Sequence, residues 1–89
     1  MVEKVYRIVG GQVEALEFHA MEGAPYLNIP ISRLSIRKGV LVAVLVRNRR
    51  IIIPFGDDHI EAGDTVILIA RAKSVVTLED ALGEGEAHR

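Results

Sequence analysis

Cysteine is absent from this 89-residue chain, and aromatic residues make up only 4% of it. Without cysteine there is no disulfide, no thiolate metal site and no cysteine nucleophile, and the composition fits a reducing compartment. Few aromatic side chains leave few platforms on which nucleic-acid bases stack. The formal net charge of −1 gives no overall positive field for binding phosphates. A small nucleic-acid-binding module therefore stays only as an alternative, and no nucleic-acid partner is expected.

Long hydrophobic runs are also missing. The longest apolar run covers residues 40–46, far short of the roughly 20 residues that span a bilayer. The first residues carry charges and lack the apolar core of a signal peptide. We therefore expect a cytoplasmic protein, which would associate with a membrane only through a partner.

Aliphatic side chains are abundant instead, because 49% of the residues are hydrophobic. A chain of this length forms one domain and buries only about 60–65% of its surface. The apolar content exceeds what one small core needs, which predicts a symmetric homodimer. A monomer with a dense aliphatic core is the alternative.

The apolar residues concentrate between residues 40 and 70, which predicts the centre of a sheet. Three β-rich runs, 41–46, 51–53 and 65–69, are separated by polar, turn-forming stretches. Runs without alternation are typical of strands buried on both faces, or of a sheet whose second face meets a partner.

Two further segments precede this block. A fourth strand is expected over residues 12–20, which are bounded by glycines and a proline. Residues 5–9 are also β-like, and Gly10 and Gly11 after them fit either a tight hairpin or a flexible lead-in.

A short helix is predicted over residues 30–36, between the two groups of strands. Pro30 suits the first helical position, where its missing N–H costs nothing. Leu27, Ile31 and Leu34 recur at spacings of four and three residues, which places them on one helical face.

A second helix is predicted over residues 75–82, with Ser74 as its N-cap. Residues 1–82 would then form one domain. The polar residues 83–89 are expected to be a disordered tail.

The segment Arg47-Asn48-Arg49-Arg50 predicts a hairpin turn. Asparagine tolerates the positive φ of a type I′ turn, whereas arginine does so poorly, so a turn wider than two residues is expected. The three arginines form a small basic patch. A solvated turn is favoured over a phosphate or lipid site, because the chain is close to neutral.

Four carboxylates and a histidine lie between residues 57 and 64. Hard cations bind oxygen-rich loops of this kind, but the spacing matches no calcium loop. We favour a structural role, in which Asp57 and Asp58 make Asx turns and Asp64 accepts backbone N–H groups. No metal site is predicted.

The pattern Ile51-Ile-Ile-Pro-Phe-Gly-Asp-Asp-x-Ile-x-Ala-Gly-Asp-x-Val66 resembles the TrkA C-terminal domain, the C-terminal lobe of regulators of potassium conductance. The similarity extends over roughly residues 2–82. It implies a two-layer α+β fold with a four-stranded, mostly antiparallel sheet. A short helix would follow the first strand and another would end the domain, in the order β-α-β-β-β-α.

The resemblance also implies a function. Such lobes dimerise, hold a regulatory ligand in the dimer cleft, and typically follow a nucleotide-binding Rossmann lobe. The chain would be a cytoplasmic, ligand-sensing lobe whose partner is a membrane potassium channel, a transporter or an antiporter subunit. A ligand-free assembly domain of a cation antiporter is the alternative.

Two departures from the family pattern are visible. No Gly-x-Gly-x-x-Gly follows a strand, so there is no dinucleotide cradle. We therefore expect an excised lobe, or a stand-alone lobe whose Rossmann-type partner is another chain. Arg49 occupies a turn position where the family often has glycine.

The resemblance nominates a ligand site. Family members that bind cyclic dinucleotides use residues near the start of the central strand and around a proline. The corresponding residues here are Arg37, Lys38, Val42, Pro54 and His59, with the Arg37 guanidinium as phosphate partner. A cyclic dinucleotide or another small anionic effector is expected, and no resident cofactor. The alternative is that Arg37 is a solvated turn residue.

No catalytic residue is predicted. Ser32, Ser35 and Ser74 have no adjacent His–Asp arrangement and no nucleophile motif around them. We therefore expect that the chain is not an enzyme.

Overall fold

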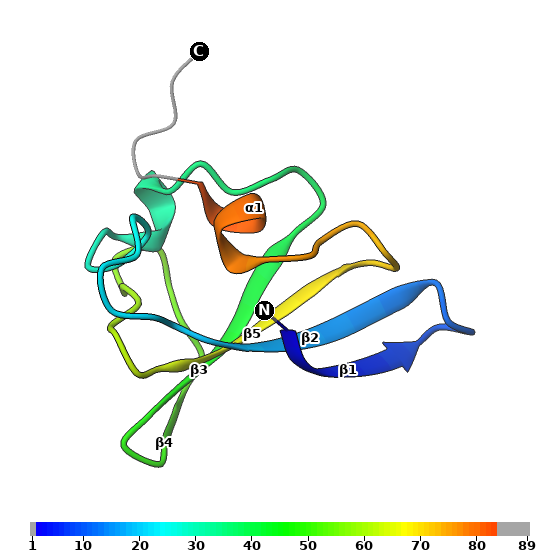
Figure 1. The fold of residues 1–89 in the computed structure, drawn as a ribbon, viewed down its shortest axis with the longest axis horizontal. Coiled ribbons are helices and arrows are strands. Elements are labelled where there is room, and N and C mark those ends of the chain that lie inside the picture. Colours follow the sequence, from blue (N-terminus) through cyan, green and yellow to red (C-terminus); the bar gives the residue numbers. More distant parts are fainter. Residues whose placement is uncertain (1, 84–89) are drawn as a thin grey trace.

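Five antiparallel strands form one sheet in the order β1-β2-β5-β3-β4 (Figure 1). The computed structural model describes residues 2–83. Its elements are β1 Val2–Ile8, β2 Val13–His19, the 3-10 helix η1 Ile31–Arg33, β3 Leu41–Arg47, β4 Arg50–Ile52, β5 Thr65–Arg71 and α1 Leu78–Leu82. The last strand in sequence is therefore the middle strand of the sheet. The α+β prediction is confirmed.

The prediction of four strands is wrong, because residues 2–8 form a fifth strand, β1. Val5 pairs with Leu16 across the hairpin. The N–H of Gly11 donates to the carbonyl of Ile8 at 3.1 Å, so the hairpin interpretation of the glycine pair is correct. β1 is an edge strand with six of its seven residues exposed, and it therefore lacks the burial pattern that marks a strand in sequence.

The predicted helix over residues 30–36 is only a single 3-10 turn, η1, and it follows the second strand rather than the first. Pro30 precedes this turn, and Leu34 at its end is already extended with ψ 150°. The N–H of Ile31 donates to the backbone carbonyl of Asp58 at 2.8 Å, and the N–H of Ser32 donates to the backbone carbonyl of Gly56 at 2.9 Å. These bonds to a distant loop satisfy donors that the first turn of a helix leaves free.

The C-terminal helix is shorter than predicted. It begins at Leu78 rather than at residue 75, and the Thr77 hydroxyl, not Ser74, caps it by accepting from the N–H of Asp80 at 3.0 Å. The β-branched residues before Thr77 disfavour the helix. The predicted tail lies outside the described residues, apart from Gly83, which ends α1 with φ 65°. Within residues 2–83 no helix has the length and apolar character that a membrane span needs.

The hairpin between β3 and β4 has a two-residue turn, so the wider turn predicted from the sequence is wrong. Arg47 pairs with Arg50, and Asn48 and Arg49 have φ values of 51° and 68°. Both values lie in the left-handed region that a type I′ turn requires. The twist of the paired strands therefore overrides the poor preference of arginine for positive φ.

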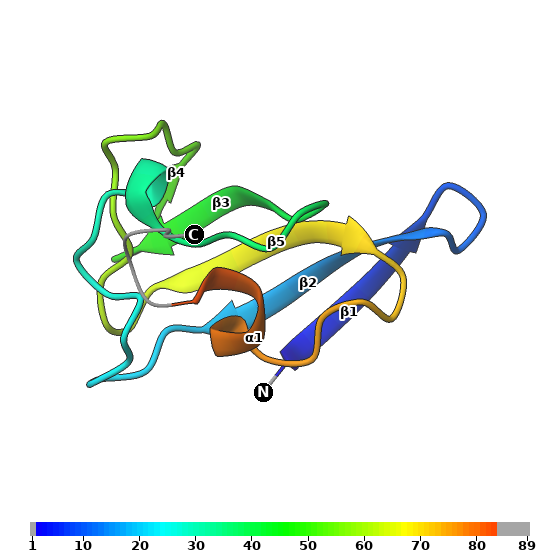
Figure 2. The same ribbon diagram turned by 90° about the horizontal axis from the view of Figure 1, so that it is seen from above.

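The core lies on one side of the sheet. Leu16 and Phe18 of β2, and Val66 and Leu68 of β5, meet Leu78 of α1 there, and all are buried. Figure 2 shows α1 lying over this side of the sheet. The hairpin tips extend from the rim of the sheet, and the strands that hold the candidate site are anchored in the core.

Candidate functional site

An ion-pair cluster lies where β3 ends and β5 begins. We define the Arg47 cluster as Arg47, His59, Glu61 and Asp64. Arg47 is the last residue of β3. The other three residues belong to the loop before β5, whose turn is closed by Gly63 at φ 90°, a value that favours glycine.

The centre of the Arg47 cluster is a two-point contact. Arg47 donates through Nε to Asp64 Oδ1 at 2.9 Å and through Nη2 to Asp64 Oδ2 at 2.8 Å. The Asp64 side chain is buried, and it also accepts from the N–H of Glu61 at 2.9 Å. A buried carboxylate needs such partners, because losing its hydration is costly.

The rest of the cluster surrounds the Arg47 guanidinium with acceptors. Arg47 Nη2 donates to the His59 carbonyl at 2.8 Å, and Nη1 lies 3.3 Å from Glu61 Oε2. His59 Nε2 lies 2.9 Å from the same Glu61 oxygen. The hydrogen bond with Asp64 raises the pKa of Arg47 above its ordinary value, and burial opposes that rise. Arg47 is therefore a permanent cation that holds the loop to the strand.

This geometry revises the predicted basic patch and confirms part of the carboxylate interpretation. Arg47 is half-buried and paired rather than solvated, whereas Arg49 and Arg50 are exposed at the tip as predicted. Asp64 accepts a backbone N–H, as predicted. Asp58 accepts the N–H of Phe55, three residues before it, at 2.7 Å, which is not the geometry of the predicted Asx turn. In the part of the chain that the structure describes, no group of three acidic or histidine side chains is arranged to hold a metal ion.

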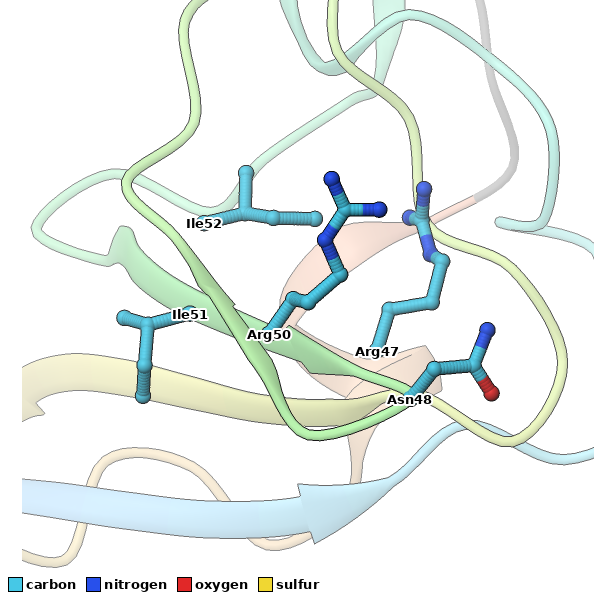
Figure 3. Close-up of a pocket in the computed structure, with 5 residues that line it drawn as sticks. All are labelled: Arg47, Asn48, Arg50, Ile51 and Ile52. Atoms are coloured by element: carbon cyan, nitrogen blue, oxygen red, sulfur yellow. The ribbon is translucent and has the colours of Figure 1, made fainter.

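A pocket of about 260 Å³ opens beside the same hairpin and is lined by Arg47, Asn48, Arg50, Ile51 and Ile52. We call it the hairpin pocket. Figure 3 shows the side chains of Arg47, Arg50 and Ile52 rising on one side of the hairpin, while Ile51 points to the other. Because Asp64 and Glu61 already neutralise Arg47, Arg50 and Asn48 supply the donors that a small anion would meet.

Two of the nominated ligand residues, Arg37 and Lys38, lie in the loop that leads into β3. Arg37 Nη1 is 3.0 Å from Asp80 Oδ2 of α1 and also donates to the carbonyl of Ser74. Arg37 is therefore oriented by α1, although its side chain stays 46% exposed. Lys38 is exposed.

The other three nominated residues lie elsewhere. Val42 is buried in the core, so a ligand would reach it only if the core opened. His59 belongs to the Arg47 cluster, and Pro54 lies in the loop after β4. Backbone bonds hold the loop of Pro54 and His59 against η1. Arg37 is held instead against α1, because its backbone N–H donates to the carbonyl of Ala81 at 2.8 Å. None of the five nominated residues lines the hairpin pocket.

Two arrangements of charged residues could hardly be predicted from the sequence. Arg47 and Asp64 are 17 residues apart, and their pairing depends on β3 lying beside β5. Glu14 is also buried, and it accepts from the N–H of Lys73 at 3.1 Å while lying 3.4 Å from Arg7 Nε. The proximity of Asp64 to the Gly63 turn was the one usable signal, because it predicted a backbone acceptor there.

Comparison with known proteins relates this geometry to a family. The TrkA-C domain matches residues 15–83. A Trk system potassium uptake protein TrkA homolog from Archaeoglobus fulgidus is 34% identical over 80 residues, which are 90% of this chain and 18% of that protein. The Trk system potassium uptake protein TrkA of Azorhizobium caulinodans is 30% identical over 78 residues, or 88% of this chain and 17% of that protein.

The chain thus spans less than a fifth of the length of these relatives. The family match includes the whole Arg47 cluster and the hairpin pocket, whereas β1 lies outside it. It covers well over half of the chain, and it confirms the resemblance seen in residues 51–66. The chain belongs to the TrkA-C domain family.

Proposed function

We propose that this chain is a regulatory lobe of a potassium-transport system, which acts on the cytoplasmic side as a ligand-sensing dimer. The observation that carries the proposal is the TrkA-C match over residues 15–83, together with relatives named as Trk potassium uptake proteins. The role is binding and not catalysis. The membrane channel or transporter, and a Rossmann-type lobe, would come from a partner chain or from another part of a longer polypeptide.

The proposed mechanism is a shift between two dimer geometries. A ligand bound where two subunits meet favours the geometry for which it has the higher affinity. A transporter attached to the dimer then responds to the change in geometry. The well-packed core and the Arg47 cluster support this mechanism, because they let each subunit move as a rigid unit.

The proposed ligand is a small anion, such as a cyclic dinucleotide, bound near Arg37 and Lys38. Arg37 is already oriented by Asp80, which reduces the entropy lost on binding. Gly39 follows with φ 83° and open space around it, so a ligand can approach the backbone closely. A two-fold axis would supply both cations twice, which suits a two-fold symmetric anion. Pro54 and His59 would be contributed across the interface, and Val42 would support the site from the core.

A thermal-shift screen of cyclic dinucleotides and nucleoside phosphates tests ligand sensing. One of these anions is expected to raise the melting temperature of the wild-type chain. Loss of a charge-assisted contact from both subunits in Arg37→Ala should weaken binding by at least about 100-fold. Arg50→Ala is the matched control, because it removes an arginine from the hairpin pocket instead.

Two results would redirect the proposal. If no anion stabilises the wild type at millimolar concentration, ligand sensing fails and the ligand-free assembly domain is the better description. If Arg50→Ala weakens binding and Arg37→Ala does not, the hairpin pocket is the ligand site.

The transport role has a separate test in cells. Deleting this lobe from its host should change the rate of rubidium uptake, rubidium being a tracer for potassium. Restoring the wild-type chain should reverse the change. An uptake rate that is unaffected at every external potassium concentration would contradict a role in potassium transport.

A further inference from the structure

β4 is the last strand in the order of the sheet, and its outer edge carries unpaired backbone groups. Residues that flank a two-residue hairpin turn exchange both hydrogen bonds, and the next opposed pair exchanges none. Arg47 and Arg50 flank the turn, so Ile51, opposite Val46, points its N–H and C=O away from β3. Within residues 2–83, Ile53 directly after β4 also makes no backbone hydrogen bond. This edge therefore offers donors and acceptors to another strand.

The side chains along the β4 edge do not protect it from pairing. Ile51 and Ile53 are 68% and 65% exposed, and the single charge of β4 is Arg50 at its start. The opposite edge, β1, alternates charged residues such as Lys4 with apolar ones, and its register shifts after Val2. Charges and bulges are the usual means by which an edge strand avoids pairing with another chain. β4 is therefore the less protected edge.

The charge beside the β4 edge is positive and uncompensated. Arg50 and Ile52 line the hairpin pocket on one side of the hairpin, and Ile51 points to the other side (Figure 3). Arg47 is neutralised within the Arg47 cluster, whereas none of the ion pairs formed between residues 2 and 83 includes Arg50. A free guanidinium binds a carboxylate through two parallel hydrogen bonds. The hairpin pocket is therefore suited to one acidic side chain.

We infer that β4 binds an extended segment of a partner polypeptide as a sixth, antiparallel strand. One acidic side chain of the segment enters the hairpin pocket beside Arg50, and apolar side chains lie against Ile51 and Ile53 on the other side. Successive side chains of a strand point to opposite faces, so the segment has the pattern apolar–acidic–apolar. In recognition by strand addition, main-chain bonds supply affinity and side-chain pockets supply specificity.

Charge favours such a segment over two other occupants. A second copy of the chain would bring another hairpin with the same positive residues, Arg49 and Arg50, to this edge, and like charges on paired strands are destabilising. A free anion would fill the pocket but leave the backbone groups and the exposed side chain of Ile51 uncovered. An acidic and apolar peptide strand covers all three features.

This site is separate from the proposed ligand site at Arg37, and it requires neither that ligand nor a dimer. It adds a partner surface to the proposed regulatory function. The site uses the outer edge of β4, whereas the loop of Pro54 and His59 is bonded to η1. A peptide on β4 and an anion near Arg37 can therefore bind at the same time.

A capped peptide, Ser-Thr-Val-Glu-Val-Thr-Ser, tests the inference by NMR titration of the isotope-labelled chain. Saturable shift changes are expected at the amides of Arg50, Ile51 and Ile53, and hydrogen exchange at Ile51 should become slower. Because the contact covers only a few residues, a Kd of about 0.1–1 mM is expected. No binding at millimolar peptide, or shift changes confined to β1, would overturn the inference.

Reversal of charge on both partners tests the role of Arg50. Arg50→Glu should weaken binding of the glutamate peptide by at least about tenfold, because a charge-assisted contact is lost. A peptide with lysine in place of glutamate should bind Arg50→Glu more tightly than it binds the wild type. Lys4→Glu is the matched control, since it makes the same change of charge at an exposed position of the other edge strand, and it should leave binding unchanged. Circular dichroism checks the fold of both variants.

Modified peptides test the strand pairing itself. A valine opposite Ile51 in an antiparallel sixth strand lies on the same face and exchanges both backbone bonds with it. Methylation of the two valine nitrogens should therefore abolish binding, whereas methylation of the glutamate nitrogen should be tolerated. The peptide Ser-Thr-Glu-Val-Val-Thr-Ser has the same composition without the alternation, and it should bind more weakly.

The remaining outcomes contradict the inference in distinct ways. Equal binding of all the glutamate-containing peptides, or of N-acetylglutamate amide alone, would show a site for small anions rather than a strand. Equal binding to the wild type and to Arg50→Glu would remove the pocket from recognition. None of these results bears on the anion screen at Arg37 or on rubidium uptake, so the inference and the proposed function can fail independently.

Discussion

The guanidinium of Arg47 donates to both carboxylate oxygens of Asp64, at 2.9 Å through Nε and 2.8 Å through Nη2. Asp64 is only 1% exposed, so this contact replaces nearly all of its hydration. It joins the end of β3 to the residue that precedes β5, beside the hairpin pocket. The pair therefore links the core of the sheet to the loop that carries His59.

Removing the arginine of this pair should be strongly destabilising. In Arg47→Ala the buried Asp64 keeps only its backbone partner, so the free energy of unfolding is expected to fall by about 3 kcal/mol. Urea denaturation followed by circular dichroism measures this change. Arg37→Ala is the matched control: its pair with Asp80 is exposed on both sides, so its loss should stay within about 1 kcal/mol. Equal losses in the two variants would contradict the role given to Arg47.

Replacing Arg49 with glycine should stabilise the chain. Arg49 has φ 68°, a conformation that is strained for arginine and relaxed for glycine. Removing this backbone strain stabilises the folded state by more than the extra conformational entropy of glycine stabilises the unfolded state. The free energy of unfolding is therefore expected to rise by about 0.5–1 kcal/mol in Arg49→Gly. Arg50→Gly, in the strand that follows the turn, should instead be destabilising. A loss of stability in Arg49→Gly would mean that the arginine side chain makes contacts that offset the strain.

The start of α1 can be checked by removing its cap. Thr77→Ala deletes the oxygen that accepts from the N–H of Asp80, and a lost N-cap costs about 1 kcal/mol. Ser74→Ala should cost less, about 0.5 kcal/mol, because Ser74 is not the cap and its hydroxyl bond to Arg71 is exposed. Thermal unfolding of the two variants side by side makes the comparison, and a larger loss in Ser74→Ala would favour the longer helix predicted from sequence.

Tyr26 should make stability depend on alkaline pH. Burial raises the pKa of Tyr26 above its ordinary value of 10.0, although its hydrogen bond with the N–H of Met21 lowers it in part. Above pH 10 the unfolded chain loses this proton while the folded chain keeps it. The free energy of unfolding should therefore decline as pH rises from 10 toward the folded pKa, by at most about 1.4 kcal/mol per pH unit from this group.

The control for this pH dependence is Tyr26→Phe, which keeps the buried ring and removes the ionisable group. Denaturation at a series of pH values should give a shallower decline for the variant than for the wild type. Parallel declines would show that other groups cause the alkaline loss of stability.

Sequence alone was sufficient where the controlling interactions are short-range. The β-branched runs at 41–46 and 65–69 predicted β3 and β5 within a residue or two. The Gly63-Asp64 pair predicted a turn with a backbone acceptor, and the motif in residues 51–66 identified the family. Periodicity, turn preference and motif spacing are all local properties, so they can be read along the chain. The nominated ligand residues remain a prediction.

Tertiary structure alone decided which segments lie together. β5 enters the sheet between β2 and β3, and only this placement pairs Arg47 with Asp64 and leaves one face of the sheet open. β1 became a strand because β2 offers it a partner, and η1 stayed a single turn because a distant loop accepts its N–H groups. These outcomes depend on hydrogen bonds and burial between residues far apart in sequence, and such contacts are set by the packing of the whole chain rather than by local preference.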